Sequence, residues 1–517
     1  MRKRKVQWLA AACVFCLAQP VWAATESTTV YQDQLDSVDQ SYLGEISKAS
    51  TPDNSNIRVV RRGEKAKSAQ PTEQLPTRID ADKMSYTGST GDVYAQGDVV
   101  VTQGNQTLMS PRIEGNTKTT EYRTVGGYRF LENGGKSKDI TGQNMTYRTS
   151  DHHFTADQAF GWNDPYYVKG QNATFDGETG HMEKGMVTTK HAMAFKHTPD
   201  YRVEGQDIKV YPGDKVVIKK PSFYIKNFKV LSLPSYTASL RHDKEGKFSI
   251  FSLVPKPTYS SDDGIGLHGS TEYPIGKHGE AYIDYRWYSK SGFKPKVGYR
   301  HYLPWATASI GYSKESNEYN DETVWVEKIG ELRLDTHTYH IGKSPFTARG
   351  ETSIGYWKEG SVKGVHKDYK VEVSHDPINL WKDGTLRFFG GYQRDYYGYD
   401  KSIRSMPYWG AQFRTAVGPR VNAWVSYNQR NISYNNSPYR FDSTELPKEL
   451  IYGGSFKLTR LDDISVSVKQ NMMSGDVDSI YYTYHRDLHS FDMYLTYKDA
   501  HRSNNDQWKI KFVGKDF

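Results

Sequence analysis

The chain has 517 residues, of which 36% are hydrophobic, and a formal net charge of +8 at pH 7, with a mean hydropathy of -0.76. After the N-terminal segment no run approaches the roughly 18 apolar residues that a spanning helix needs, so the composition excludes a helical membrane protein. So small a charge on so long a chain does not indicate nucleic-acid binding. Aromatic residues nevertheless reach 14%, including 39 tyrosines, which suits the interfacial girdles of a membrane β-barrel.

The N-terminus has the pattern of a secretory signal peptide over residues 1–23. A basic stretch at residues 2–5 precedes an apolar stretch at residues 6–18. Val21 and Ala23 occupy the positions three and one before a cleavage site. The pattern therefore predicts export and removal of this segment.

The chain that follows the predicted cleavage site is expected to begin with a tether. Residues 24–76 are polar and have no hydrophobic period, which predicts a disordered linker. Both cysteines, Cys13 and Cys16, lie before the cleavage site. We therefore expect the mature chain to form neither a disulfide nor a thiolate metal site.

Residues 77–236 show a β pattern that is built as a repeat. The hexad Gly-Gln-Asn-Met-Thr-Tyr at Gly142 returns in related form at Gly170 and Gly205, and more loosely at Gly97. Each close copy has Asn or Asp two residues after the glycine, followed by apolar residues at alternate positions. This spacing predicts stacked strand-turn-strand units, as in a β-solenoid or an open jelly roll.

Side chains of one parity in these repeats are expected to share an apolar interior, because successive side chains of a strand point to opposite faces. The interior candidates are Val99, Val101, Met145, Tyr147, Phe175, Ile208, Val210, Phe223 and Ile225. Ordinary packing between two sheets would produce the same pattern, so residue type alone does not assign a ligand to this interior.

Residues 237–517 read as one amphipathic strand after another, which predicts a closed antiparallel outer-membrane β-barrel. One apolar set that alternates with polar neighbours is Ala281, Ile283, Tyr285 and Trp287. At roughly 20 residues per strand and turn, a segment of this length would form on the order of 14 strands. The chain ends in an alternating segment typical of such barrels, with Trp508, Ile510, Phe512 and the terminal Phe517.

Four prolines lie near the expected junction of the two regions, namely Pro221, Pro234, Pro255 and Pro257. Proline removes a donor from a sheet ladder, so it weakens strand pairing. These prolines are candidates for a gate at which the first and last barrel strands part. Taken singly, each proline is equally well explained as a residue that ends a strand at a turn.

No enzyme signature stands out in the chain. It contains no H-E-x-x-H, G-x-S-x-G or phosphate-loop motif, so we expect no catalytic residue, no metal site and no cofactor. The 16 histidines are dispersed. Those that lie close in sequence, His152, His153, His485 and His489, fit surface or lumen positions better than ligand positions. We therefore interpret the chain as a protein that is not an enzyme.

Several motifs gather at the end of the repeat region. They are Pro199-Asp200-Tyr201-Arg202-Val203-Glu204-Gly205, Val210-Tyr211-Pro212-Gly213-Asp214-Lys215, Phe223-Tyr224-Ile225 and Leu233-Pro234-Ser235-Tyr236. Together they resemble the end of the periplasmic domain of the LPS-assembly outer-membrane protein family, known as LptD or OstA. Over the barrel the resemblance is architectural. The chain departs from larger family members, which carry disulfides between domain and barrel, and its barrel segment is short.

The resemblance implies an all-β chain with a periplasmic OstA-like jelly roll followed by a transmembrane barrel in the outer membrane of a diderm bacterium. It implies a translocon that receives lipopolysaccharide (LPS) from a periplasmic LptA-like bridge protein by β-augmentation. The jelly-roll interior would shield the acyl chains, and a lateral barrel gate would release LPS into the outer leaflet. The barrel-assembly machinery would insert such a protein, and a plug lipoprotein of LptE type is a further expected partner.

Two other functions stay open at this point. A passive porin or channel would explain the barrel but not the repeat domain. A periplasmic lipid-binding carrier would explain the repeat domain but not the terminal strands with aromatic faces.

Overall fold

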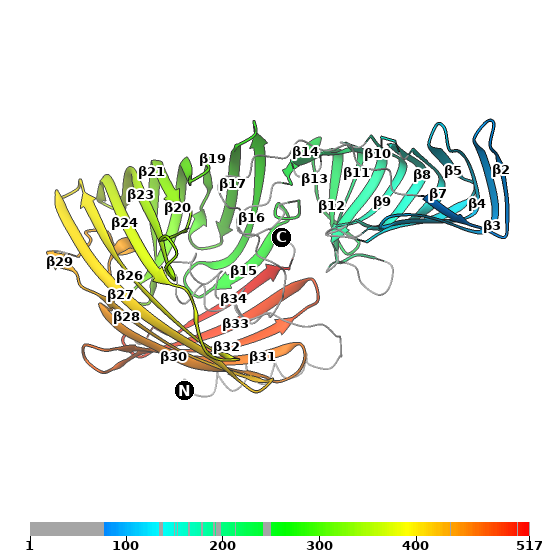
Figure 1. The fold of residues 1–517 in the computed structure, drawn as a ribbon. Helices are drawn as coiled ribbons and strands as arrows, with labels where there is room; N and C mark the ends of the chain where they lie inside the picture. The colour runs from blue at the N-terminus through cyan, green and yellow to red at the C-terminus, as the bar shows by residue number, and fades with distance from the viewer. Residues whose placement is uncertain are drawn as a thin grey trace.

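The computed structural model of the protein describes residues 77–515, apart from 134–137, 149, 152, 164–165, 177–178, 190–191, 193–197, 212–213, 241–249, 435 and 504. The predicted signal peptide, the predicted linker and Phe517 lie outside the described residues. Apart from one short 3-10 helix, the described elements are β-strands. No helix among the described residues is long and apolar enough to cross a membrane. The strands form an open antiparallel sheet followed by a closed one (Figure 1).

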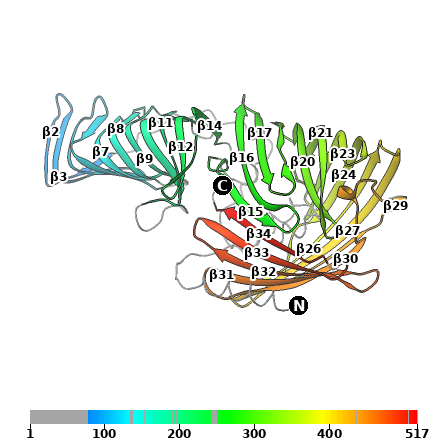
Figure 2. The ribbon, with the colours of Figure 1, turned by 180° about the vertical axis from the view of Figure 1, so that it is seen from behind.

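The open sheet curves into a roll that extends from one end of the barrel (Figures 1 and 2). Its path is β1-β3-β4-β5-β7-β8-β9-β10-β11-β12-β13, with β2 paired to β3, β6 paired to β4 and β7, and β14 paired to β12. The strands are β1 (Thr77–Asp80), β2 (Lys83–Thr87), β3 (Asp92–Gln103), β4 (Gln106–Asn116), β5 (Glu121–Thr124), β6 (Gly127–Glu132), β7 (Lys138–Arg148), β8 (His153–Asn163), β9 (Tyr166–Phe175), β10 (Gly180–Thr189), β11 (Tyr201–Tyr211), β12 (Lys215–Ile225), β13 (Phe228–Ser232) and β14 (Ser235–Ser239). The domain boundary expected after residue 236 falls inside β14.

The repeated hexads mark a bend that recurs from strand to strand. The Asn or Asp of each copy has a positive φ, at 51° for Asn144, 50° for Asn172 and 44° for Asp207, and Asp98 of the loose copy has 41°. Among residues with a side chain, Asn and Asp reach this region at the lowest cost. The register between β3 and β4 shifts at this point, as at a β-bulge, which bends a strand. The motif is therefore a conformational signal that curves the roll.

The closed sheet is a 16-stranded antiparallel barrel, in which β18, β22, β25 and β29 continue β19, β21, β24 and β28. Its strands are β15 (Lys256–Ser260), β16 (Gly264–Ile275), β17 (Gly279–Tyr288), β18 (Gly292–Phe293), β19 (Lys296–Tyr302), β20 (Ala306–Tyr319), β21 (Glu322–Thr336), β22 (Tyr339–His340), β23 (Phe346–Glu359), β24 (Val362–His375), β25 (Ile378–Trp381), β26 (Gly384–Tyr397), β27 (Ser402–Val417), β28 (Val421–Arg430), β29 (Ser433–Tyr434), β30 (Lys448–Lys457), β31 (Asp462–Asn471), β32 (Val477–Asp487), β33 (Phe491–Ala500) and β34 (Gln507–Gly514). β15 pairs with β34 and closes the barrel.

The expected count of 14 strands is too low because the turns are shorter than the allowance made for them. The link between β20 and β21, for example, consists of Asn320 and Asp321 alone. Both have a positive φ, as in the type I′ turns that join twisted strands with two residues.

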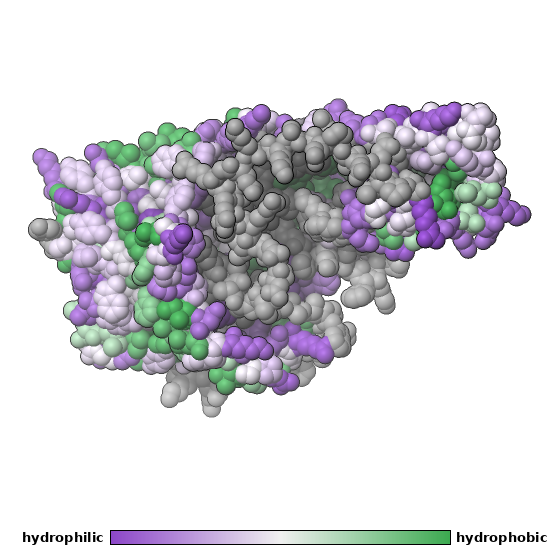
Figure 3. Space-filling model, viewed as in Figure 1, coloured by the Kyte–Doolittle hydropathy of each residue, from purple (hydrophilic) through white to green (hydrophobic). Residues whose placement is uncertain are grey.

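The barrel wall has an apolar outer face and a polar inner face, as the alternation predicts. Ile283 and Trp287 of β17 are 49% and 45% exposed, whereas Tyr282 is buried and Asp284 and Arg286 are half-buried. Part of the outer apolar surface is visible as green patches on the barrel in Figure 3. Water-exposed apolar side chains on this scale are typical of a surface that lies in lipid.

Residues 436–447 form a loop on the inner side of the wall that contains the 3-10 helix η1 (Arg440–Asp442). Tyr439 of this loop is fully buried and packs with Trp357 and Tyr397 on the wall. Its hydroxyl donates to the Trp357 carbonyl oxygen at 3.4 Å. We call residues 436–447 the inner loop.

Candidate functional site

The interior candidates of the roll lie on its inward face. Val99, Met145, Ile208 and Phe223 are fully buried. Val101, Tyr147, Val210 and Ile225 are partly buried and pack against the same two apolar clusters, and Phe175 is half-buried. The adjacent Thr174 and Lys209 are exposed, whereas Thr146 is half-buried. The predicted parity therefore agrees with the burial, although burial alone does not assign a ligand.

The two apolar clusters divide the roll along its length. The distal cluster includes Val99, Ile113 and Met145. The proximal cluster includes Ile208 and Phe223 and continues beyond the roll. Ile140 and Phe154 pack against both. The roll therefore has one apolar interior from its free end to the barrel.

The bends of the repeats are held by polar contacts on the outward face. Asn144 donates to Asp157 at 2.8 Å, and Asp207 accepts from Lys219 at 2.6 Å and contacts His181 at 2.7 Å. Hydrogen bonds from Lys219 and then from His181 lower the pKa of Asp207. The positive-φ residue of a repeat thus has two roles. Its backbone forms the bend, and its side chain contacts a neighbouring strand.

The proximal cluster crosses from the roll into the near rim of the barrel, which we define as the end that contacts the roll. Tyr201 packs edge-on against Phe251, with ring centroids 4.8 Å apart, and against Phe491 of β33 at 6.0 Å. Asp200 also accepts a hydrogen bond from Ser490. The two sheets are therefore joined by a packed interface that contacts the wall beside β34.

Tyr236 of β14 is a second link between roll and barrel. Its hydroxyl lies 3.3 Å from the Thr271 hydroxyl of β16. Burial raises the pKa of Tyr236 to about 12, so this hydroxyl stays protonated and can donate at neutral pH.

An apolar groove of about 450 Å³ lies at this junction. Its lining residues are Val230, Leu231, Leu233, Leu253, Pro255, Tyr285 and Phe293. They come from the end of the roll, the segment before β15, and the wall strands β17 and β18. The groove therefore adjoins both the roll and the part of the wall that contains the first barrel strand.

The seam between β15 and β34 has the fewest paired residues of all the wall pairs, if the pairs made by the short strands β18, β22, β25 and β29 are left aside. Only Thr258, Tyr259 and Ser260 are paired with β34, whereas β33 pairs with β34 over eight residues. Pro257 precedes the paired residues and has no N–H to donate. The β15–β34 ladder is therefore shorter than the β33–β34 ladder beside it.

The other end of the seam is bridged by the tip of the β20–β21 hairpin. Asp262 accepts from the Thr323 amide at 2.7 Å, from its hydroxyl at 2.9 Å and from Gln507 at 3.2 Å. Lys498 contacts Asp321, and Gln507 also donates to the Asp321 carbonyl oxygen. We call Asp262, Asp321, Thr323, Lys498 and Gln507 the far-rim clasp.

The prolines fall into two groups. Pro255 lines the junction groove and Pro257 lies in β15. Pro221 lies in β12 and Pro234 between β13 and β14, where the carbonyl oxygen of each accepts an amide from the facing segment. They mark the point at which the partner of β12 changes from β13 to β14, away from the seam. A gate role for any of the four stays a prediction.

The clasp and the inner loop were not identified from the sequence. The contacts of Asp262 come from residues more than fifty positions away, so no local pattern indicates them. The single available signal was the short Asn-Asp turn at residue 320, which predicts a tight hairpin but not its partner.

Part of the chain matches a known protein family. Residues 78–215 match the family described as "LptA/(LptD N-terminal domain) LPS transport protein", and no curated protein matches the chain. Among solved structures, the chain is similar to LptH, "the LptA homologous periplasmic component of the conserved lipopolysaccharide transport device from Pseudomonas aeruginosa", with 21% identity, covering 20% of this chain and 77% of that chain, at a TM-score of 0.19. It is also similar to a loop-deletion mutant of OmpT of Vibrio cholerae (10%, 50% and 96%, TM-score 0.29) and to a mutant of the Rh. blastica porin (7%, 50% and 96%, TM-score 0.31).

The fold defines the class of protein as an outer-membrane β-barrel that carries an open β-roll at its N-terminal side. The family match identifies the roll as the N-terminal domain shared by LptA and LptD. Residues 78–215 thus carry the domain of this LPS transport family, in agreement with the sequence resemblance.

Proposed function

We propose that the chain is the outer-membrane translocon that receives LPS and inserts it into the outer leaflet through the β15–β34 seam. The acyl chains travel in the apolar interior of the roll, pass the junction groove and enter the bilayer beside the seam. The observation that carries the proposal is one continuous apolar interior, which runs from the distal cluster to the near rim of the barrel, beside the short β15–β34 ladder.

The chemistry of LPS supports this route. Acyl chains gain about 25 cal/mol for each Å² removed from water, so a continuous apolar interior lowers the cost of carrying them through the periplasm. The sugar-bearing head stays outside such an open roll, because burying its charged and polar groups without partners is costly.

The free end of the roll suits a periplasmic bridge protein. β1 and β2 both pair with β3 at this end, and an exposed edge strand pairs readily with another chain. We propose that an LptA-like protein docks there by β-augmentation. Contacts with a plug lipoprotein of LptE type and with the barrel-assembly machinery remain predictions.

Photo-crosslinking in cells tests the route through the roll. A photo-reactive residue at Phe175 or Val210 should trap LPS, because both side chains face the interior. The matched controls Thr174 and Lys209 point to the opposite face and should trap much less. Equal labelling at both sets would refute the interior route.

Reversible closure tests the exit. Cysteines at Thr258 and Lys511, which are register partners across the seam, should stop the appearance of new LPS at the cell surface when oxidised and restore it when reduced. A matched control places cysteines at Ser465 and Thr483, which are register partners in the wall. Surface LPS that is unchanged by a fully formed Thr258–Lys511 crosslink would exclude the seam as the exit.

Neither alternative accounts for all of these features. A porin needs no roll, whereas the apolar interior of the roll continues to the near rim of this barrel. A soluble carrier needs no apolar wall, whereas Ile283, Trp287 and Ile310 are about half exposed on the outside of this one. Conductance of the purified barrel without any crosslinking of LPS would favour the porin.

A further inference from the structure

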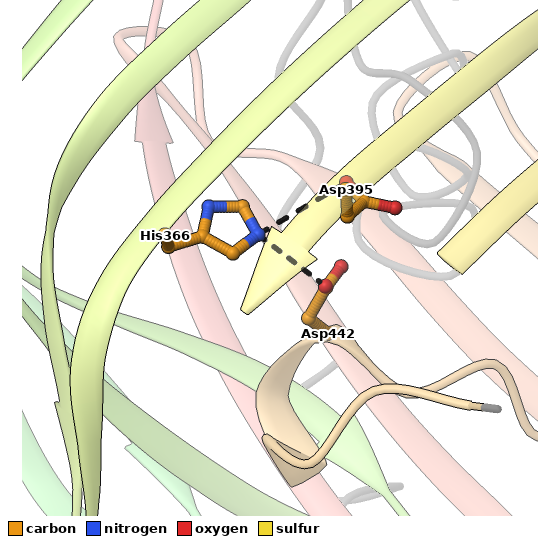
Figure 4. Close-up of side chains that lie close together, drawn as sticks. All are labelled: His366, Asp395 and Asp442. Atoms are coloured by element: carbon orange, nitrogen blue, oxygen red, sulfur yellow. Dashed lines mark ion pairs between the residues drawn. The ribbon is translucent and has the colours of Figure 1, made fainter. Parts of the chain in front are cut away.

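A buried group of three potential metal ligands lies inside the barrel (Figure 4). His366 comes from β24, Asp395 from β26 and Asp442 from η1 of the inner loop. His366 is 2% exposed and Asp395 is fully buried. One ligand atom from each residue lies within 4.8 Å of the other two. The group therefore connects the inner loop to two strands of the wall.

The imidazole of His366 makes no hydrogen bond. Neither ring nitrogen has a hydrogen-bond partner although both are buried. Nε2 points between the two carboxylates, 3.8 Å from Asp442 and 4.0 Å from Asp395, which is too far for a hydrogen bond. The ring is fixed by stacking on Trp357, with centroids 3.7 Å apart. A buried polar atom left unsatisfied costs about 1–3 kcal/mol, so this gap needs a physical reason.

A second histidine of the same barrel shows how a simple His–Asp contact looks here. His485 lies between two aspartates as well, and its ring nitrogens are 3.0 Å from Asp463 and 2.9 Å from Asp492. These are ordinary hydrogen-bond lengths. Nε2 of His366 instead lies almost 1 Å farther from the carboxylate oxygens than the ring nitrogens of His485 do. This larger separation leaves space at the centre of the group.

The space has the dimensions of a metal ion. A point equidistant from the three ligand atoms would lie about 2.5 Å from each, and small side-chain rotations bring this to the roughly 2.0–2.2 Å typical of nitrogen and oxygen ligands. Imidazole with carboxylates is a donor set of first-row divalent transition metals.

The surroundings of the two carboxylates support a cation at this place. Arg404 binds the other oxygen of Asp395 at 2.8 Å and of Asp442 at 2.9 Å. Tyr397 donates to Oδ2 of Asp442, the oxygen that faces His366. Such outer contacts orient metal-binding carboxylates. A single guanidinium neutralises one of the two carboxylate charges, so the group retains one negative charge for a cation.

We propose that His366, Asp395 and Asp442 bind one divalent transition-metal ion, which fastens the inner loop to the barrel wall. The ion would satisfy Nε2 of His366 and replace a flexible contact by bonds to three segments. This inference depends on the barrel and not on the proposed transport function, so either can fail without the other.

Metal binding by the purified mature protein tests the proposal. The protein is prepared in detergent without a histidine tag, stripped with a chelator and titrated with Co²⁺. We expect visible absorption bands and one tightly bound equivalent. His366→Phe keeps the stacking on Trp357 but removes the ligand, so it should lose that equivalent. The matched control His485→Phe should keep it.

Two results would overturn the proposal. One is equal Co²⁺ stoichiometry in the wild type and in folded His366→Phe protein, and the other is no tight equivalent in the wild type. If His366→Phe fails to fold, X-ray absorption of the Co²⁺-loaded wild type decides the question. One imidazole nitrogen in the metal shell supports the site, and a shell of oxygen alone refutes it.

Discussion

Removal of the Asp262 carboxylate is expected to loosen the far end of the β15–β34 seam. This carboxylate accepts three hydrogen bonds, two from Thr323 and one from Gln507 at the start of β34. A hydrogen bond to a charged group contributes roughly 1.5–3 kcal/mol, and water at this half-buried site replaces part of the loss. We therefore expect Asp262→Ala to lower the cost of opening the seam by about 2–3 kcal/mol.

That free energy corresponds to a measurable change in hydrogen exchange. Since about 1.4 kcal/mol is a factor of ten, the open seam should become roughly 30- to 140-fold more populated. Hydrogen–deuterium exchange of the detergent-solubilised protein, followed by mass spectrometry, should show faster exchange in peptides that cover residues 256–262 and 507–514. The amide of Ser261, which donates to Trp508 at 2.9 Å, lies at the centre of this effect.

A matched variant separates the clasp from general loosening of a rim turn. Asp400 also accepts two hydrogen bonds, both from Ser402 within the β26–β27 turn, and it lies away from the seam. Asp400→Ala should leave exchange of the seam peptides unchanged. Seam exchange that is the same in Asp262→Ala and in the wild type would refute the reasoning.

Three further predictions concern the roll. Ile208→Ala should lower its free energy of unfolding by about 2–5 kcal/mol, because the side chain is fully buried, whereas Lys209→Ala should change it by less than about 0.5 kcal/mol; chemical denaturation measures both. Gly142→Ala should reduce the yield of folded protein, because its Cβ would lie 1.8 Å from a backbone oxygen, whereas Gly127→Ala meets nothing closer than 3.8 Å; heat-modifiable gel migration measures the yield. The lowered pKa of Asp207 means that its contribution to stability is full above the ordinary carboxyl pKa and is lost as the pH falls toward the lower folded value; unfolding of Asp207→Asn against pH should lack this acid-side loss.

The sequence was informative wherever a local pattern determines the structure. Alternating apolar residues reveal which face of a strand is inward, so the interior candidates from Val99 to Ile225 lie on one face of the roll. The repeated Asn or Asp is also local, because the left-handed conformation at Asn144, Asn172 and Asp207 depends on the residue type. Both signals need no knowledge of distant contacts.

The far-rim clasp and the group around His366 depend on contacts between segments that are far apart in the chain. Asp262 meets Thr323 and Gln507 only because the barrel closes and the β20–β21 hairpin reaches its seam. His366 and Asp442 come together only because the inner loop enters the lumen. Strand number was underestimated for a related reason, since turn length is set by two or three residues whose pattern is weak compared with that of a strand.

The junction between roll and barrel is one apolar surface that holds the two sheets together and lies on the proposed transport route. The chain has no cysteine after Cys16, so no disulfide can fix the orientation of the roll. Tyr201, Phe251 and Phe491 pack there instead, and their cluster is continuous with the interior of the roll. Packing of this kind is non-directional and tolerates small displacements, unlike a covalent bridge. The proposed route for acyl chains can therefore run beside the contact that holds the two sheets together, because both need the same exclusion of water.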